Sequence, residues 1–189
     1  MTDLLQTYGD LVLLAMDQMS LYYQATLTRV WAPVGQTPIV RLVPQRDHRH
    51  FYGALELRSG REIALPATEQ TSLVTATFIR VLLLLFPTQH MLLLLDRAPW
   101  HFGEELRSLF AENQDRLAVM YFPPACPDLN PQEHVWSQAR ENISHNHTYR
   151  AFQTLIEDFE TYLNETPFET NFMEKYAPLR LDDYANPIW

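Results

Sequence analysis

The sequence predicts an α/β fold in which a mixed sheet carries helices on both faces. Short apolar runs typical of buried strands recur along the chain, as in LVLLAM, MLLLL and LAVMY. Helix-like segments separate these runs in the second half, whereas turn-rich extended segments fill the first. A hydrophobic content of 47% over 189 residues is enough to form the core of one domain.

The first part of the chain predicts an antiparallel meander. Residues 11–17 form an apolar run that ends in Asp17, which predicts a buried strand with an acid at its carboxyl end. Residues 27–44 predict extended chain with turns at proline and glycine positions. Residues 50–66 predict a hairpin that turns at Gly60.

The second part predicts parallel strands joined by helices. Strands are predicted at residues 90–96 and 116–122, and helices at residues 69–86, 102–113, 131–145 and 150–165. Thr71 or Ser72 is expected to cap the first of these helices, and Phe102 is placed on the apolar face of the second. Strands that alternate with helices form parallel sheets with helices on both sides.

Three acids fall where functional groups can meet. Asp17 and Asp96 end two predicted strands, and neighbouring strands lie ~5 Å apart, so their carboxylates are expected at one sheet edge. Glu133 begins a helix after a proline-rich loop. Residues 130–133, Asn-Pro-Gln-Glu, also fit a helix start in which the glutamate only completes a capping box.

Three converging carboxylates repel one another unless a cation offsets their charge. Carboxylate oxygens are the ligands that Mg²⁺ and Mn²⁺ prefer. Two such ions ~4 Å apart serve in-line displacement at phosphorus, where one activates the attacking oxygen and the other stabilises the leaving oxygen. The acids therefore predict a two-ion site for phosphodiester chemistry.

Three motifs resemble those of bacterial insertion-sequence transposases related to the mariner superfamily. They are MDQMSLYY with TRVWAPVGQTP, LLLLDRAPWH, and YFPPACPDLNPQEHVWSQAR, and they span about residues 11–145. The resemblance implies a ribonuclease-H-like, integrase-type domain with an Asp, Asp, Glu triad. Asp17, Asp96 and Glu133 then become catalytic residues and ligands of two Mg²⁺ or Mn²⁺ ions. The implied activity is cleavage and strand transfer of DNA during transposition, a form of DNA recombination.

The sequence departs from this family at several positions. Gln18 stands where the family commonly has an acid, and Arg97 stands where it has an asparagine. Arg97 could pair with Asp96 and compete with a metal, or it could grip a DNA phosphate. Only ten residues precede the first predicted strand, where these transposases usually carry a helix-turn-helix region. We therefore expect either a homodimer or a separate helix-turn-helix subunit to supply DNA recognition.

A net charge of −9 argues against a general nucleic-acid binder. Residues 27–61 nevertheless hold six arginines against two acids, so a polyanion would meet this region first, although a solvated polar face explains the arginines equally well. His101 matches a histidine of the family's second motif, but it could instead cap the next helix. The candidate DNA contacts are Arg29, Arg41, Arg46, Arg49, Arg97 and His101.

Other features bound the setting of the protein. The apolar segments are too short to span a bilayer, and one cysteine, Cys126, excludes an internal disulfide, so we expect a cytoplasmic protein without a membrane partner. Residues 1–165 are expected to form the catalytic domain, and residues 166–189 a proline- and aromatic-rich tail. Asp128 could add a fourth acid or form an Asx turn. Two other functions stay open: an inactive transposase remnant that acts as an interaction module, and a ribonuclease or resolvase of the same fold.

Overall fold

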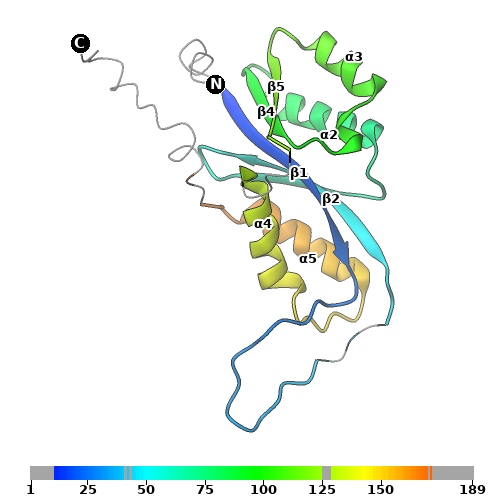
Figure 1. Ribbon diagram of the computed structural model, residues 1–189, viewed down its shortest axis with the longest axis vertical. Coiled ribbons are helices and arrows are strands. Elements are labelled where there is room, and N and C mark those ends of the chain that lie inside the picture. The colour runs from blue at the N-terminus through cyan, green and yellow to red at the C-terminus, as the bar shows by residue number, and fades with distance from the viewer. Residues whose placement is uncertain (1–10, 41, 43, 125–128, 170, 172–189) are drawn as a thin grey trace, which may run out of the picture.

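A five-stranded mixed sheet forms the centre of the computed structural model, with helices on both faces (Figure 1). The structure describes residues 11–40, 42, 44–124, 129–169 and 171. The strands are β1 (Val12–Tyr22), β2 (His48–Glu56), β3 (Glu62–Ala67), β4 (Met91–Leu95) and β5 (Leu117–Tyr121). The helices are α2 (Ser72–Leu85), α3 (Glu104–Glu112), α4 (Gln132–Ala139) and α5 (Phe152–Glu165), with a short 3-10 turn η1 (Pro99–His101) and a π turn η3 (Arg140–Ser144).

The strand order is β3-β2-β1-β4-β5. The first three strands pair antiparallel, whereas β4 pairs parallel to β1 and β5 pairs parallel to β4. This arrangement confirms the predicted antiparallel meander followed by parallel strands. Gly60 lies at the turn between β2 and β3 with a φ of +72°, a conformation that glycine adopts without steric cost.

The two faces of the sheet bury different helices. Because strand side chains alternate between faces, Leu13 and Ala15 pack with α4 and α5, whereas Leu14 and Met16 pack with α2 and α3. Figure 1 shows the two helix pairs on opposite sides of the sheet. The same alternation places Asp17 on the face that α4 and α5 cover.

The first strand is longer than predicted. β1 pairs with β4 from Val12 to Ala15, but it pairs with β2 as far as Tyr22. The prediction that the strand ends at Asp17 is therefore wrong, because β2 supplies hydrogen-bond partners beyond that point. Asp17 still lies just past the last residue paired with β4, and Asp96 lies just past the end of β4.

Residues 27–47, here called the arm, connect β1 to β2 and project from the sheet (Figure 1). The described residues of the arm contain no strand or helix, and Trp31 and Val34 are fully exposed. A backbone hydrogen bond from Tyr23 to Asp47 closes the base of the arm. The arm thus reaches away from the sheet while its two ends stay together.

Two helix boundaries differ from the expected ones. Thr71 caps α2 as predicted, because its hydroxyl oxygen accepts the backbone N–H of Val74 at 3.3 Å. Phe102, by contrast, precedes α3 instead of lying on its apolar face, and 48% of its surface is exposed. The helix starts later because Gly103, with a φ of +155°, interrupts the backbone before Glu104.

The chain beyond α5 returns to the sheet. The backbone N–H of Phe168 donates to Gly60 O at 2.8 Å, and the Phe168 side chain is buried with the α4 and α5 cluster. The later residues of the expected tail lie outside the described residues. Within the described part of the chain, no helix has the length and apolar character needed to cross a bilayer.

Candidate active site

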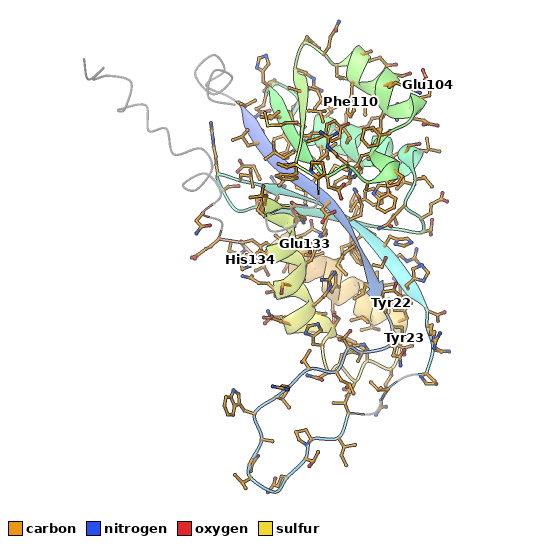
Figure 2. The ribbon with its side chains drawn as sticks, in the orientation of Figure 1. Tyr22, Tyr23, Glu104, Phe110, Glu133 and His134 are labelled. Carbon is orange, nitrogen blue, oxygen red and sulfur yellow. The ribbon has the colours of Figure 1, made fainter. Side chains whose placement is uncertain are left out.

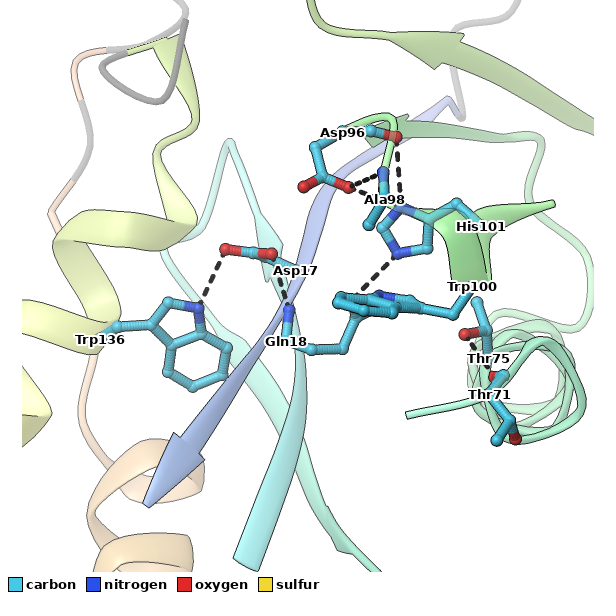
Figure 3. Close-up of polar contacts among 9 residues, drawn as sticks. All are labelled: Asp17, Gln18, Thr71, Thr75, Asp96, Ala98, Trp100, His101 and Trp136. Carbon is cyan, nitrogen blue, oxygen red and sulfur yellow. Dashed lines mark hydrogen bonds and ion pairs between the residues drawn. The ribbon is translucent and has the colours of Figure 1, made fainter. Parts of the chain in front are cut away.

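Asp17 is a buried acid held by two N–H donors (Figure 3). The backbone N–H of Gln18 donates to Oδ1 at 2.8 Å, and the indole N–H of Trp136 donates to Oδ2 at 3.3 Å. Trp136 belongs to α4, so this helix contacts the carboxylate directly. The sheet and the helix therefore fix both oxygens of Asp17.

Burial raises the pKa of Asp17 from 3.8 to about 7, because the carboxylate loses its water. The hydrogen bond from Gln18 opposes this shift, whereas the negative charges of Glu133 and Asp96 add to it, and the hydrogen bond from Trp136 opposes it. The three predicted acids are thus electrostatically coupled. A positive charge nearby would relieve the same unfavourable interactions that raise the pKa.

Asp96 occupies a different environment at the same sheet edge. Its Oδ1 accepts the backbone N–H of Ala98 at 3.0 Å and lies 2.7 Å from Nδ1 of His101. Partial burial raises the pKa of Asp96, but the hydrogen bonds from His101 and Ala98 outweigh this effect and leave the pKa below its ordinary value. Asp96 therefore stays charged.

His101 connects the two acids through Gln18. Its Nε2 lies 3.0 Å from Oε1 of Gln18, and the same oxygen accepts the indole N–H of Trp100 at 2.5 Å. Both ring nitrogens of His101 lie within hydrogen-bond distance of an oxygen atom. Gln18 thus joins the turn after β4 to β1.

Glu133 lies in the first turn of α4 and its side chain is exposed (Figure 2). The Oδ1 of Asn130 accepts the backbone N–H of Gln132 at 3.2 Å. The N-cap position of α4 is held by Pro131, one residue later than predicted. Within the described part of the chain, no hydrogen bond returns from the Glu133 carboxylate to Asn130. The cap therefore does not use Glu133, which leaves its carboxylate available.

A buried polar pair holds the start of α4 against the sheet. The side-chain amide of Gln132 donates to Oε1 of Glu62 at 2.7 Å, and both residues are almost fully buried. Burial raises the pKa of Glu62 well above its ordinary value, despite the hydrogen bonds from Gln132 and Ala54. This pair fixes the residue that precedes Glu133.

Gly53 makes this close approach possible. It pairs with Asp17 across strands β1 and β2, and a Cβ atom there would collide with Glu62, Gln132 and Trp136. Sequence reasoning missed Gly53, Glu62 and Gln132. A glycine inside a strand was the available signal, since it marks a close approach to the backbone.

The described residues contain no group of three His, Cys, Asp or Glu side chains close enough to hold a metal ion. Asp17 and Asp96 lie on neighbouring strands at one sheet edge, and Glu133 is coupled to Asp17 through charge. Asp128 and Cys126 lie outside the described residues.

The arginines of residues 27–61 that the structure describes lie near the two ends of β2. Arg29 and Arg46 are exposed on the arm, and Arg49 lies on β2 beside it. Arg58 and Arg61 lie at the opposite end of β2, ~25 Å away at 3.3 Å per residue, so the arginines of residues 27–61 do not form one patch. Arg41 lies outside the described residues.

The structure separates two candidates of the second motif. His101 is 1% exposed, so its side chain cannot touch DNA in this conformation and acts instead on Asp96. The guanidinium carbon of Arg97 lies 5.6 Å from the ring centre of Tyr121. Among the described residues, the ion-pair partner of Asp96 is His101 and not Arg97.

Residues 12–156 match the model of a protein family described as the DDE superfamily endonuclease. The chain belongs to this family. The match covers the elements from β1 to the first turns of α5, and it includes all three acids. The chain is therefore a DDE-type endonuclease domain.

Solved structures show the same fold. A Mos1 transposase paired-end complex with the left transposon end is 13% identical, with a TM-score of 0.62, over 85% of this chain and 49% of that chain. The catalytic domain of Mos1 mariner transposase is 10% identical, with a TM-score of 0.56, over 82% and 70% respectively. A chain of a simian T-cell lymphotropic virus intasome is 10% identical, with a TM-score of 0.55, over 84% of this chain and 50% of that chain. The predicted ribonuclease-H-like fold is confirmed.

A protein of Sinorhizobium fredii (strain NBRC 101917 / NGR234), y4pE/y4sA, is 33% identical over 67 residues. This stretch covers 35% of the present chain and 46% of the relative. The chain therefore spans about half the length of the relatives it matches, both this protein and the Mos1 transposase.

Proposed function

We propose that this chain is the catalytic domain of an insertion-sequence transposase that cuts DNA and joins DNA strands. The proposal rests mainly on one observation: a buried aspartate at the sheet edge, Asp17, is coupled to Asp96 and Glu133 in a chain of the DDE endonuclease family. Asp17, Asp96 and Glu133 would together hold two divalent ions.

The donor set fits Mg²⁺ or Mn²⁺. All three side chains offer carboxylate oxygens, the ligands that these ions prefer. Burial makes the charged form of Asp17 unfavourable, and a bound cation would offset this effect. Glu133 is exposed and not used by the helix cap, so its side chain can change rotamer freely. One related structure is a Mos1 paired-end complex with Mn, and another is the Mos1 catalytic domain and Raltegravir with Mg.

The residues of this chain would divide the work. Bound divalent ions would activate the attacking oxygen and stabilise the leaving oxygen at phosphorus. Trp136 and the N–H of Gln18 orient Asp17, and His101 orients Asp96. Rigid support of this kind matters because a metal ligand displaced by a fraction of an ångström binds poorly.

DNA is the substrate under this proposal. The Mos1 complexes contain transposon ends or form a strand transfer complex. A net charge of −9 predicts weak DNA binding by the chain alone, so a second copy or a separate helix-turn-helix subunit would supply end recognition. Arg29, Arg46 and Arg49 would extend the DNA contact along the arm, and the cytoplasm is the expected location.

A divalent-ion titration tests the metal site. We expect Mn²⁺ to raise the melting temperature of the wild type, but not that of Asp96→Ala or Asp17→Asn. Glu141→Gln changes an exposed acid of η3 outside the site and should keep the full response. The proposed ligands would be refuted if Mn²⁺ raised the melting temperature of all four proteins equally. They would also be refuted if it raised the melting temperature of none of them.

An assay of DNA nicking tests the activity. The wild type with a DNA-recognition partner should nick duplex DNA in Mn²⁺ and leave RNA–DNA hybrids intact, whereas Glu133→Gln should be inactive. Preferential cleavage of the hybrid would instead indicate a ribonuclease. The inactive-remnant alternative loses its specific reason, because Arg97 lies on Tyr121 and does not block Asp96.

A further inference from the structure

The core does not account for one exposed aromatic residue at the sheet edge. Phe102 is 48% exposed, precedes α3 and does not belong to either buried cluster. Its ring stacks on Tyr121, with ring centres 5.4 Å apart and planes 16° from parallel. The guanidinium of Arg97 lies over the same tyrosine. These three side chains are called the ladder below.

The ladder stands next to the acids. Tyr121 is the last residue of β5. Arg97 directly follows Asp96 in the sequence, so the Cα atoms of these two residues are about 3.8 Å apart. Tyr121 packs with the cluster under α2 and α3, whereas Asp17 contacts α4 on the other face. The ladder and the acids therefore flank one sheet edge from opposite sides.

The stack also explains how Arg97 avoids Asp96. Successive residues of an extended chain project to opposite faces, so Arg97 reaches Tyr121 while Asp96 bonds His101. The Arg97 side chain is exposed and has no ion-pair partner among the described residues. Its charge remains available to an anion beside the acids.

The chemistry of the ladder fits a nucleotide. Flat aromatic rings and guanidinium planes stack on nucleobases, and a guanidinium also binds phosphate with paired N–H donors. A base inside a duplex has both faces covered by its neighbours, whereas an unpaired base exposes one. The exposed ring of Phe102 therefore selects an unpaired nucleotide.

We propose that the ladder of Arg97, Tyr121 and Phe102 binds one unpaired nucleotide of the DNA strand next to the acids. The base stacks on Phe102, and Arg97 contacts the adjoining phosphate. This proposal rests on the proposed function for the identity of the substrate, but not on metal binding or cleavage.

Fluorescence anisotropy in metal-free buffer separates stacking from charge. One probe is a labelled duplex with a three-nucleotide single-stranded overhang, and the other carries an abasic overhang with the same phosphates. We expect the wild type to bind the base-bearing probe about tenfold more tightly, within the range that stacking supplies per base. Phe102→Leu keeps an apolar side chain without the flat ring, and it should abolish the preference.

Two further variants complete the test. Arg97→Ala should weaken binding to both probes, because the phosphates remain in each. Met120→Ala changes an exposed apolar residue of the same strand, 40% accessible and adjacent to Tyr121, and should leave the preference intact.

Equal binding of both probes by the wild type would overturn the proposal, as would no binding to either. A preference that survives in Phe102→Leu would also overturn it. Loss of the preference together with intact Mn²⁺ responses would leave the proposed catalytic site standing. A preference that depends on Phe102 without any nicking activity would instead support the ladder and refute the proposed activity.

Discussion

Asp17 and Asp96 are the same residue type at one sheet edge, yet their surroundings shift their acidity in opposite directions. Asp17 is buried against α4 and faces two other acids, which raises its pKa to about 7. Asp96 is half exposed and bonded to His101 and Ala98, which lowers its pKa. The edge thus combines one acid that is charged at neutral pH with one whose charge depends on its neighbours, and this difference suits a site that gains cations.

Gly53→Ala should break the Asp17 side most severely. The new methyl group would collide with Glu62, Gln132 and Trp136, all buried, so we expect a loss of about 3 kcal/mol in the free energy of unfolding. Urea denaturation followed by tryptophan fluorescence measures it.

Gly35→Ala is the matched control on the arm. No atom lies within 4 Å of a Cβ there, although the φ of +84° adds some strain. Its cost should be about 1 kcal/mol. Similar losses in both variants would mean that Gly53 does not provide the close approach of α4.

Asp17→Asn should stabilise the protein at alkaline pH. A folded-state pKa of about 7, above the ordinary 3.8, means that the wild type loses stability as the pH rises from about 4 through 7. Asparagine removes this loss, but its amide nitrogen cannot accept the second N–H group that Asp17 holds, so the variant should be about 1 kcal/mol less stable at pH 4. At pH 8 it should be about 3 kcal/mol more stable than the wild type. Urea denaturation across this range measures the difference.

The pH dependence should not vanish completely, because the raised pKa of Glu62 gives a slope of the same sign. If the Asp17→Asn variant is less stable than the wild type at pH 8, Asp17 is well hydrated in the folded protein. The contrast with Asp96 would then be lost.

His101→Ala should lower the free energy of unfolding by about 2 kcal/mol, because it removes a buried ring and the hydrogen bonds to Asp96 and Gln18. The lowered pKa of Asp96 means that its stabilisation is present above the ordinary value and is lost as the pH falls. The deficit of the variant should therefore shrink below about pH 4.

His134→Ala, which changes an exposed histidine of α4, should have little effect on stability and serves as the control. A deficit of His101→Ala that is independent of pH would mean that His101 only fills space.

Trp100→Phe should have the smallest effect. It removes the indole donor to Gln18 and should cost about 1 kcal/mol in thermal unfolding. Trp31→Phe changes a fully exposed indole of the arm and should be neutral. Equal losses in the two variants would exclude a structural role for the bond between Trp100 and Gln18.

The sequence was sufficient to predict the sheet, its meander and parallel strands, and the helices from α2 to α5. These elements carry strong apolar patterns, and Thr71 is a helix cap that sequence rules recognise. The electrostatic coupling of Asp17, Asp96 and Glu133 fits the predicted group of acids. Their roles as metal ligands remain a prediction.

The parts that the sequence did not reveal depend on contacts between distant residues. Gly53, Glu62 and Gln132 meet only after β2, β3 and α4 pack together, and no local pattern announces it. The end of β1 was misplaced because its partner β2 lies beyond the arm.

Two local patterns were also misleading. The arginines between residues 27 and 61 look like one basic region in the sequence, but β2 carries them to opposite ends. Phe102 fits the apolar spacing of the following helix, but the backbone of Gly103 separates it from α3.

The register between β1 and β4, in which Ala15 stands beside Leu94, makes the site intolerant of small insertions and deletions. A single codon gained or lost between Val12 and Asp17 would turn the aspartate to the apolar side under α2 and α3. It would also turn leucines away from α4 and α5. A one-residue insertion or deletion in this strand would therefore remove Asp17 from the sheet edge that it shares with Asp96.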